Sequence, residues 1–168
     1  MKAQIEVPTE KEIFVKIAID AWELQNSRVD KLLEELTEKQ LQTETASGKN
    51  SGAYLLGHLI AVSDGLLPIF GLSGRLYPQL EEVFLKSSEK SGLEKPSVAD
   101  LKKYWREVNI KIKEYFKEMK AEDWFDKHVA ISAEDFAKEP HRNKLSVLIN
   151  RTTHQSYHLG QLVFLKDR

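Results

Sequence analysis

Apolar and charged residues alternate along most of the chain with the period of an α-helix, and four long segments show this pattern. The first starts at Thr9-Glu10-Lys11-Glu12, where Thr9 can accept a hydrogen bond from the amide of residue 12 while Glu12 reaches back. We expect this helix to run from about residue 10 to the high thirties. Its apolar residues recur at helical spacing, with charges on the other side: Ile13, Ile17, Ala21, Leu24, Val29, Leu32, Leu33 and Leu36.

The second and third helices also have recognisable ends. The second begins near Ser51, after a run of turn-forming residues, and Pro68 either kinks it or lies close to its end. The third begins after Ser97, an N-cap serine followed three residues later by Asp100, whose charge suits the positive end of the helix dipole. Apolar residues at helical spacing continue it to about Lys120.

A fourth helix is expected from Asn143 almost to the C-terminus. It follows a long connection over residues 121–142, in which Trp124 to Ile131 could include a short extended piece. Residues 74–96 are predicted to hold a helical turn or two and then exposed loop. No repeat or linker divides the chain, so the sequence predicts an all-α protein: a four-helix bundle with long crossover loops, in one domain over residues 1–168.

The composition limits the chemistry, because the 168 residues include five histidines and no cysteine. A metal site must then use His, Asp, Glu or water, and a reactive thiol must come from outside the chain. The 25 basic and 26 acidic residues nearly cancel, so nothing favours nucleic acid as a partner. The start of the chain lacks the apolar core of a signal peptide, and polar residues interrupt the apolar stretch Tyr54 to Leu72. We therefore expect a cytoplasmic protein without a membrane span.

The last predicted helix carries the clearest candidate site. His154 and His158 are four residues apart, so on a helix they lie one turn apart on one face, the H-x-x-x-H spacing that metal sites use. Arg151, Asn150 and Gln161 fall within about 60° of His154 on a helical wheel. This helix has few charges, so its polar arc is expected to face a cavity or a partner. The alternative is that the two histidines have this spacing by accident, or that they only form hydrogen bonds and bind no metal.

A third candidate ligand, His58, lies in the least polar predicted helix. Gly57, Ala61 and Gly65 lie beside it and would leave space for something to approach. Two adjacent helices could bring His58 to the H-x-x-x-H pair. Three neutral imidazoles with an open coordination position form a catalytic type of metal site. A core histidine with satisfied hydrogen bonds is the alternative.

Other histidines and motifs carry less weight. Gln155 stands where a zinc peptidase of the H-E-x-x-H type has its glutamate, which disfavours peptidase chemistry. His128 and His141 lie in the long loop among charged residues and are expected to be surface histidines. The three tryptophans are expected to be packing or rim residues: Trp22, Trp105 and Trp124.

Three segments resemble the DinB-like superfamily, which is named for DNA-damage-inducible proteins and includes YfiT-like metal-dependent hydrolases. They are the turn Gly48-Lys49-Asn50-Ser51, then Leu55-Leu56-Gly57-His58-Leu59, and finally His154-Gln155-Ser156-Tyr157-His158-Leu159-Gly160-Gln161-Leu162. The resemblance covers nearly the whole chain. It implies an up-down-down-up four-helix bundle, often a homodimer, in which three histidines hold a divalent metal, commonly zinc or nickel. At the matching positions these ligands are His58, His154 and His158.

The best-characterised members of that family are thiol S-transferases and isomerases that use bacillithiol, mycothiol or glutathione. The resemblance thus implies a metal-dependent thiol S-transferase that binds an external low-molecular-weight thiol, with Arg151 and Gln161 as candidates for orienting an anionic thiol or substrate. Tyr157 and Asn150 are weaker candidates. The alternatives are a hydrolase using metal-bound hydroxide, and a metal- or small-molecule-binding bundle without turnover. Hydrolysis needs a base near the metal-bound water. Asp64 is the nearest acidic residue in sequence to His58, but it lies about 120° away around a helix and is therefore a poor candidate for that base.

Overall fold

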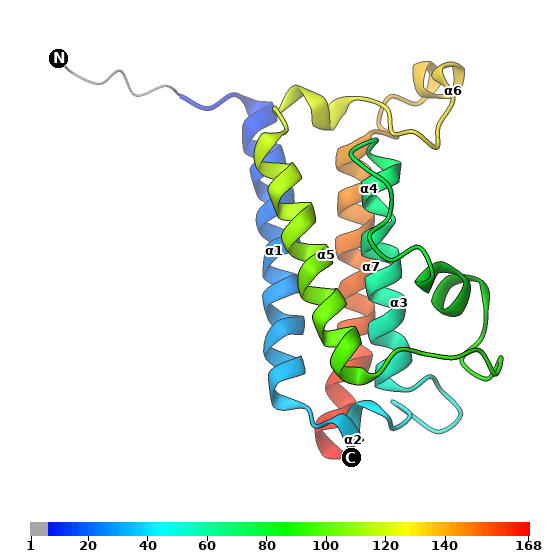
Figure 1. Cartoon of the computed structure of the whole chain (residues 1–168). Coiled ribbons are helices and arrows are strands. Elements are labelled where there is room, and N and C mark those ends of the chain that lie inside the picture. The colour runs from blue at the N-terminus through cyan, green and yellow to red at the C-terminus, as the bar shows by residue number, and fades with distance from the viewer. Residues whose placement is uncertain (1–6) are drawn as a thin grey trace.

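The computed structural model describes residues 7–168 (Figure 1). Its four long helices are α1 (Glu10–Glu35), α3 (Gly52–Asp64), α5 (Val98–Glu118) and α7 (Lys144–Leu162). The helices α1 and α7 run in one direction and α3 and α5 in the other, which is the up-down-down-up order. No β-strand occurs within residues 7–168, and the predicted all-α bundle is confirmed.

Six shorter helical segments connect or extend the long helices. They are α2 (Glu38–Leu41), α4 (Leu66–Ile69), α6 (Ala133–Lys138), the π-helical turn η1 (Glu82–Lys86) and the 3₁₀ turns η2 (Glu122–Phe125) and η3 (Val163–Asp167). The extended piece expected within residues 124–131 is reduced to an isolated bridge between Lys127 and Asn143. The backbone amide of Val129 donates instead to the carbonyl of Ile69, so this loop is held against α4.

The long helices begin where the sequence predicts. At each start an N-cap side chain accepts a hydrogen bond from a backbone amide three residues on, which satisfies a donor at the helix end. The N-cap residues are Thr9, Ser51, Ser97 and Asn143. Pro68 sets the end of α3, because its ring excludes a regular helical position for the carbonyl of Asp64, four residues earlier.

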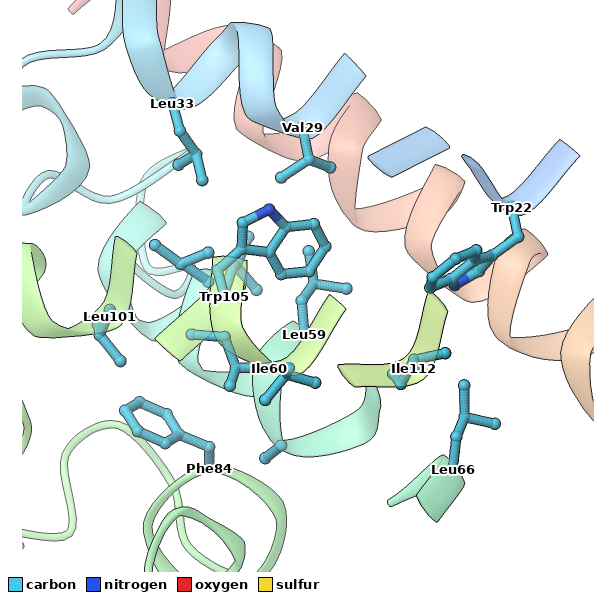
Figure 2. Close-up of a cluster of buried hydrophobic side chains, with 14 of the residues drawn as sticks. Trp22, Val29, Leu33, Leu59, Ile60, Leu66, Phe84, Leu101, Trp105 and Ile112 are labelled. Atoms are coloured by element: carbon cyan, nitrogen blue, oxygen red, sulfur yellow. The ribbon is translucent and has the colours of Figure 1, made fainter. Parts of the chain in front are cut away.

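The core lies between the four long helices and is mainly aliphatic, with tryptophan and phenylalanine rings packed among the leucine, isoleucine and valine side chains (Figure 2). Trp22 of α1, Trp105 of α5 and Trp124 of η2 are each no more than 1% exposed, so they are packing residues. The indole nitrogen of Trp105 donates to Asp30 at 2.7 Å, which satisfies its polar group despite the burial.

The first half of the apolar repeat in α1 faces away from the core. Ile13, Ile17 and Leu24 are between 45% and 59% exposed, whereas Val15 and Trp22, which lie outside the repeat, are buried. The helix α1 therefore has one buried and one exposed apolar stripe. Helical periodicity identifies an apolar face but does not say which face meets the core.

The continuous segment Gly52–Ile69, which spans α3 and α4, is long and apolar enough by composition to cross a membrane. In the structure 72% of it is buried inside the protein. A helix that is apolar on all sides is typical of the core of a soluble domain when its own chain covers it. The prediction of a buried helix in place of a membrane span agrees with this packing.

Phe84 fills the space that Gly57 leaves beside His58. A Cβ atom at residue 57 would lie 2.3 Å from the Phe84 ring, so the ring could not keep its place. At Gly65 a Cβ atom would lie 3.1 Å from the guanidinium of Arg75. The space expected beside these glycines is therefore present, and side chains of the segment after α4 occupy it.

Gly57→Ala is expected to destabilise the protein by about 1–3 kcal/mol, because the added methyl group overpacks the contact with Phe84. Gly160→Ala, in the exposed part of α7 with nothing within 4 Å of the added atom, is the matched control. It should be neutral or stabilise by up to about 1 kcal/mol through helix propensity. Urea denaturation measures both values, and equal effects of the two substitutions would contradict the proposed packing.

Candidate metal site

Three histidines from two antiparallel helices meet on one side of the bundle. His58 comes from α3, and His154 and His158 come from α7. The Nε2 atom of His154 lies 3.2 Å from Nε2 of His58 and 3.1 Å from Nε2 of His158. The structure thus brings together the three residues that the sequence singles out.

Two of the imidazoles are oriented by hydrogen bonds from their other ring nitrogen. Nδ1 of His58 donates to the carbonyl oxygen of Phe84 at 2.9 Å, and Nδ1 of His158 donates to Oε1 of Gln161 at 2.7 Å. A proton on Nδ1 leaves the lone pair of Nε2 free, and both Nε2 atoms point toward the cluster. Such outer hydrogen bonds fix the tautomer and the ring orientation of metal-binding histidines.

Burial disfavours the charged form of two histidines of the cluster, His154 and His158. It lowers the pKa of His154 to about 4, and the nearby positive charges of His158, His58 and Arg151 act in the same direction. Burial also lowers the pKa of His158, although the hydrogen bond with Gln161 partly opposes this. Neutral imidazole is the form that binds a metal ion, so the lowered pKa values of His154 and His158 favour metal binding.

The donor set and spacing fit a divalent metal ion. Two nitrogens bound to one tetrahedral ion at about 2.0 Å lie about 3.3 Å apart. The two separations from Nε2 of His154, 3.2 and 3.1 Å, are close to this value. The cluster within residues 7–168 consists of histidines alone, with His58, His154 and His158 as its members. Three neutral ligands leave a coordination position open, as in catalytic sites, so the cluster could hold a divalent metal.

Asp64 has a structural role. Its side chain is fully buried and accepts hydrogen bonds from the backbone amides of Leu76 and Tyr77, at 2.8 and 2.9 Å. These bonds hold the loop that follows α4. The structure agrees with the expectation that Asp64 is a poor candidate for a base beside the histidines.

The four polar candidates near the histidines have different environments. Gln161 contacts His158 directly, and Arg151 is partly buried, with its Nε atom lacking a hydrogen-bond partner within the described chain. Burial lowers the pKa of Arg151, and the charge of Arg75 adds to this effect. Asn150 and Tyr157 are exposed. Arg151 and Gln161 therefore remain the better candidates for contact with a bound molecule.

One residue that the sequence places on the surface is partly enclosed. His128 lines a cleft with Arg151, and its Nδ1 atom is buried without a hydrogen-bond partner among residues 7–168. His141, in contrast, is exposed as expected. No helical periodicity marks His128, because it lies in an irregular loop that the hydrogen bond from Val129 to Ile69 holds against α4.

Comparison with known proteins identifies the family of this chain and a solved structure of similar fold. The family model of the DinB superfamily matches residues 21–162, which include all three histidines. The chain belongs to the DinB superfamily. A crystal structure of a conserved protein from Enterococcus faecalis is similar to this DinB-superfamily chain in fold, with a TM-score of 0.64 at 15% identity. That match covers 90% of this chain and 94% of the other. No curated protein matches the chain.

Metal analysis tests whether this DinB-superfamily protein uses the cluster as a metal site. Tag-free protein dialysed against zinc or nickel is expected to retain one ion per chain. His58→Ala, His154→Ala and His158→Ala should each weaken binding by at least about a hundredfold, because loss of a ligand exceeds the tenfold to hundredfold effect of losing an outer partner. His141→Ala is the control, since that side chain is exposed. Wild-type protein without stoichiometric metal under these conditions would refute the site.

Proposed function

We propose that this protein is a metal-dependent thiol S-transferase that acts at the three-histidine cluster. The observation that carries the proposal is the convergence of three imidazoles without a carboxylate in the cluster of the described chain. A zinc or nickel ion held there would keep its positive charge and favour a thiolate over a thiol. The chain itself has no cysteine, so the reacting thiol is an external low-molecular-weight compound.

The reaction needs few contributions from the protein. The thiol loses its proton to solvent, its sulfur forms a bond to an electrophilic carbon, and the leaving group departs with the electron pair of the broken bond. His58, His154 and His158 would hold the ion, and Gln161 keeps His158 in the tautomer that exposes the Nε2 lone pair. Arg151 supplies a positive charge one turn along α7 from His154.

Thiol transfer is favoured over hydrolysis by the position of the acidic groups. A hydrolase that uses metal-bound hydroxide gains from a carboxylate or a further histidine near the water. The nearest acidic residue in sequence, Asp64, uses both carboxylate oxygens to accept backbone hydrogen bonds. A thiolate nucleophile needs no such base once its proton is lost. The reducing cytoplasm, where small thiols stay reduced, is the compartment that suits this activity.

An assay of glutathione and cysteine with a chromogenic aryl halide tests the proposal. Metal-loaded wild type is expected to consume thiol at least about tenfold faster than the His58→Ala, His154→Ala, His158→Ala triple variant, because that variant loses the stabilisation of the thiolate. His141→Ala should match wild type. Equal rates for wild type and the triple variant would refute the transferase, and release of product from an ester substrate by wild type alone would favour the hydrolase.

We also propose that the active form is a homodimer, formed through the outer side of α1 and α7. These helices lie side by side, and each carries exposed, uncharged side chains. The residues of this α1–α7 face are at least 50% exposed: Phe14, Ile17, Leu24, Ile149, Tyr157 and Phe164. A twofold interface pairs a surface with its own copy, so exposed apolar side chains on one face can bury one another. Exposed apolar patches of this kind mark interaction sites.

Light scattering after size exclusion tests the dimer. Wild type is expected to have twice the chain mass, and Leu24→Glu and Tyr157→Glu to have the mass of one chain, because each places like charges opposite each other. Ile110→Glu on α5 is the matched control, since Ile110 is 58% exposed and lies outside the α1–α7 face. A monomeric wild type, or a dimer that survives both substitutions, would contradict the proposal.

A further inference from the structure

A cleft of about 390 Å³ opens beside the first two turns of α7. Its polar lining comes from Arg151, Asn150 and Ser146 of α7 and from His128 and Arg142 of the preceding loop. Ile69 of α4 and Val147 of α7 form apolar walls. Arg151 and His154 are three residues apart on α7, so the cleft lies next to the histidine cluster.

Two buried nitrogens in this cleft have no hydrogen-bond partner within residues 7–168. They are Nε of Arg151 and Nδ1 of His128. Buried polar groups normally have a partner, and both of these atoms belong to side chains that line the same cleft. The backbone fixes His128 from both sides, because Val129 donates to Ile69 at 2.9 Å and Lys144 donates to Asp126 at 3.1 Å.

The charge in the cleft is positive. None of the lining residues is acidic. Arg142 is paired with Glu139 at 2.9 Å, but Arg151 forms no salt bridge in the described part of the chain. Arg75, whose charge also reaches Arg151, is bound to Glu81 at 3.0 Å and to the carbonyl of Ala61 at 2.7 Å, so it is not available to neutralise an anion.

We infer that this cleft binds the carboxylate of a small molecule whose other end reaches the histidine cluster, with Arg151 and His128 as its hydrogen-bond donors. A partly buried guanidinium binds carboxylate strongly because the hydrogen bond is charge-assisted. One unpaired guanidinium and one neutral imidazole match the single charge of a carboxylate better than the double charge of a phosphate. The apolar walls suit a short carbon chain between the two ends.

The helix sets the length of such a molecule. The cleft residues on α7 lie three to eight positions before His154, which corresponds to about 5–12 Å along the helix axis. The group at the end of the molecule that reaches the histidines is a thiol only if the proposed function holds, so the inference rests on that function for this point. It therefore narrows the substrate to thiols, or electrophiles, that carry a carboxylate several carbon atoms away from the reacting atom.

Two probes that differ only in the carboxylate distinguish its contribution to binding from that of the thiol. Isothermal titration of metal-loaded protein is expected to show 6-mercaptohexanoate binding about tenfold more tightly than 6-mercaptohexanol. Arg151→Gln should remove this preference and His128→Asn should reduce it, with the folded state of each confirmed by thermal unfolding. Arg106→Gln, a substitution of an exposed arginine on α5, is the control and should keep the preference.

A second measurement keeps this inference apart from the proposed function. In metal-free protein, hexanoate is expected to shift the side-chain NMR signals of Arg151 and His128, and hexanol is not. Hexanoate shifts without any thiol binding would support the cleft while refuting the thiol function. Equal affinity for the two mercapto probes in wild type and Arg151→Gln, with no shifts caused by hexanoate, would overturn the cleft and leave the metal site intact.

Discussion

The contact between Phe84 and Gly57 is the constraint on which the histidine cluster depends. Because residue 57 has no side chain, the Phe84 ring packs directly on α3, and this brings its own carbonyl oxygen to Nδ1 of His58. The same contact therefore completes the core and sets the orientation of a candidate ligand. A π-helical turn supplies the contact, and such turns are frequent at functional sites. Core packing and site geometry cannot vary independently here, since a shift of η1 would rotate the imidazole.

The electrostatics of the site differ from those of the whole chain. The net charge is −1, yet within the described chain the histidine cluster contains no carboxylate and the lining of the neighbouring cleft is neutral or basic. Carboxylates near this region are already engaged: Asp64 with backbone amides, Glu81 with Arg75 and Glu139 with Arg142. Burial limits the positive charge here, because it lowers the pKa of His154 and of Arg151 and so disfavours their charged forms. A locally positive, partly buried region in a nearly neutral protein favours anions at that place only.

Local signals in the sequence are enough to predict where the helices begin and which side chains of the last helix share the face of the candidate site. N-cap residues such as Thr9 and Ser97 act through neighbouring amides, and the spacing of His154 and His158 follows from helix geometry, so both could be predicted. The roles of Phe84 and His128 could not, because irregular segments place them through long-range contacts that leave no period in the sequence. The buried face of α1 could not be predicted for a related reason: a helix with two apolar faces gives the same pattern whichever face is buried.

The separation of the three histidines along the chain has a mechanical consequence. His58 and His154 are 96 residues apart in sequence and come from different helices. An ion shared by them would act as a removable cross-link between α3 and α7, closing a long loop in the way that a disulfide does. The chain has no cysteine with which to form a permanent bridge. Its tertiary structure would then be tied by a bond that depends on metal supply and acidity, and that reduction, which breaks a disulfide, would not break.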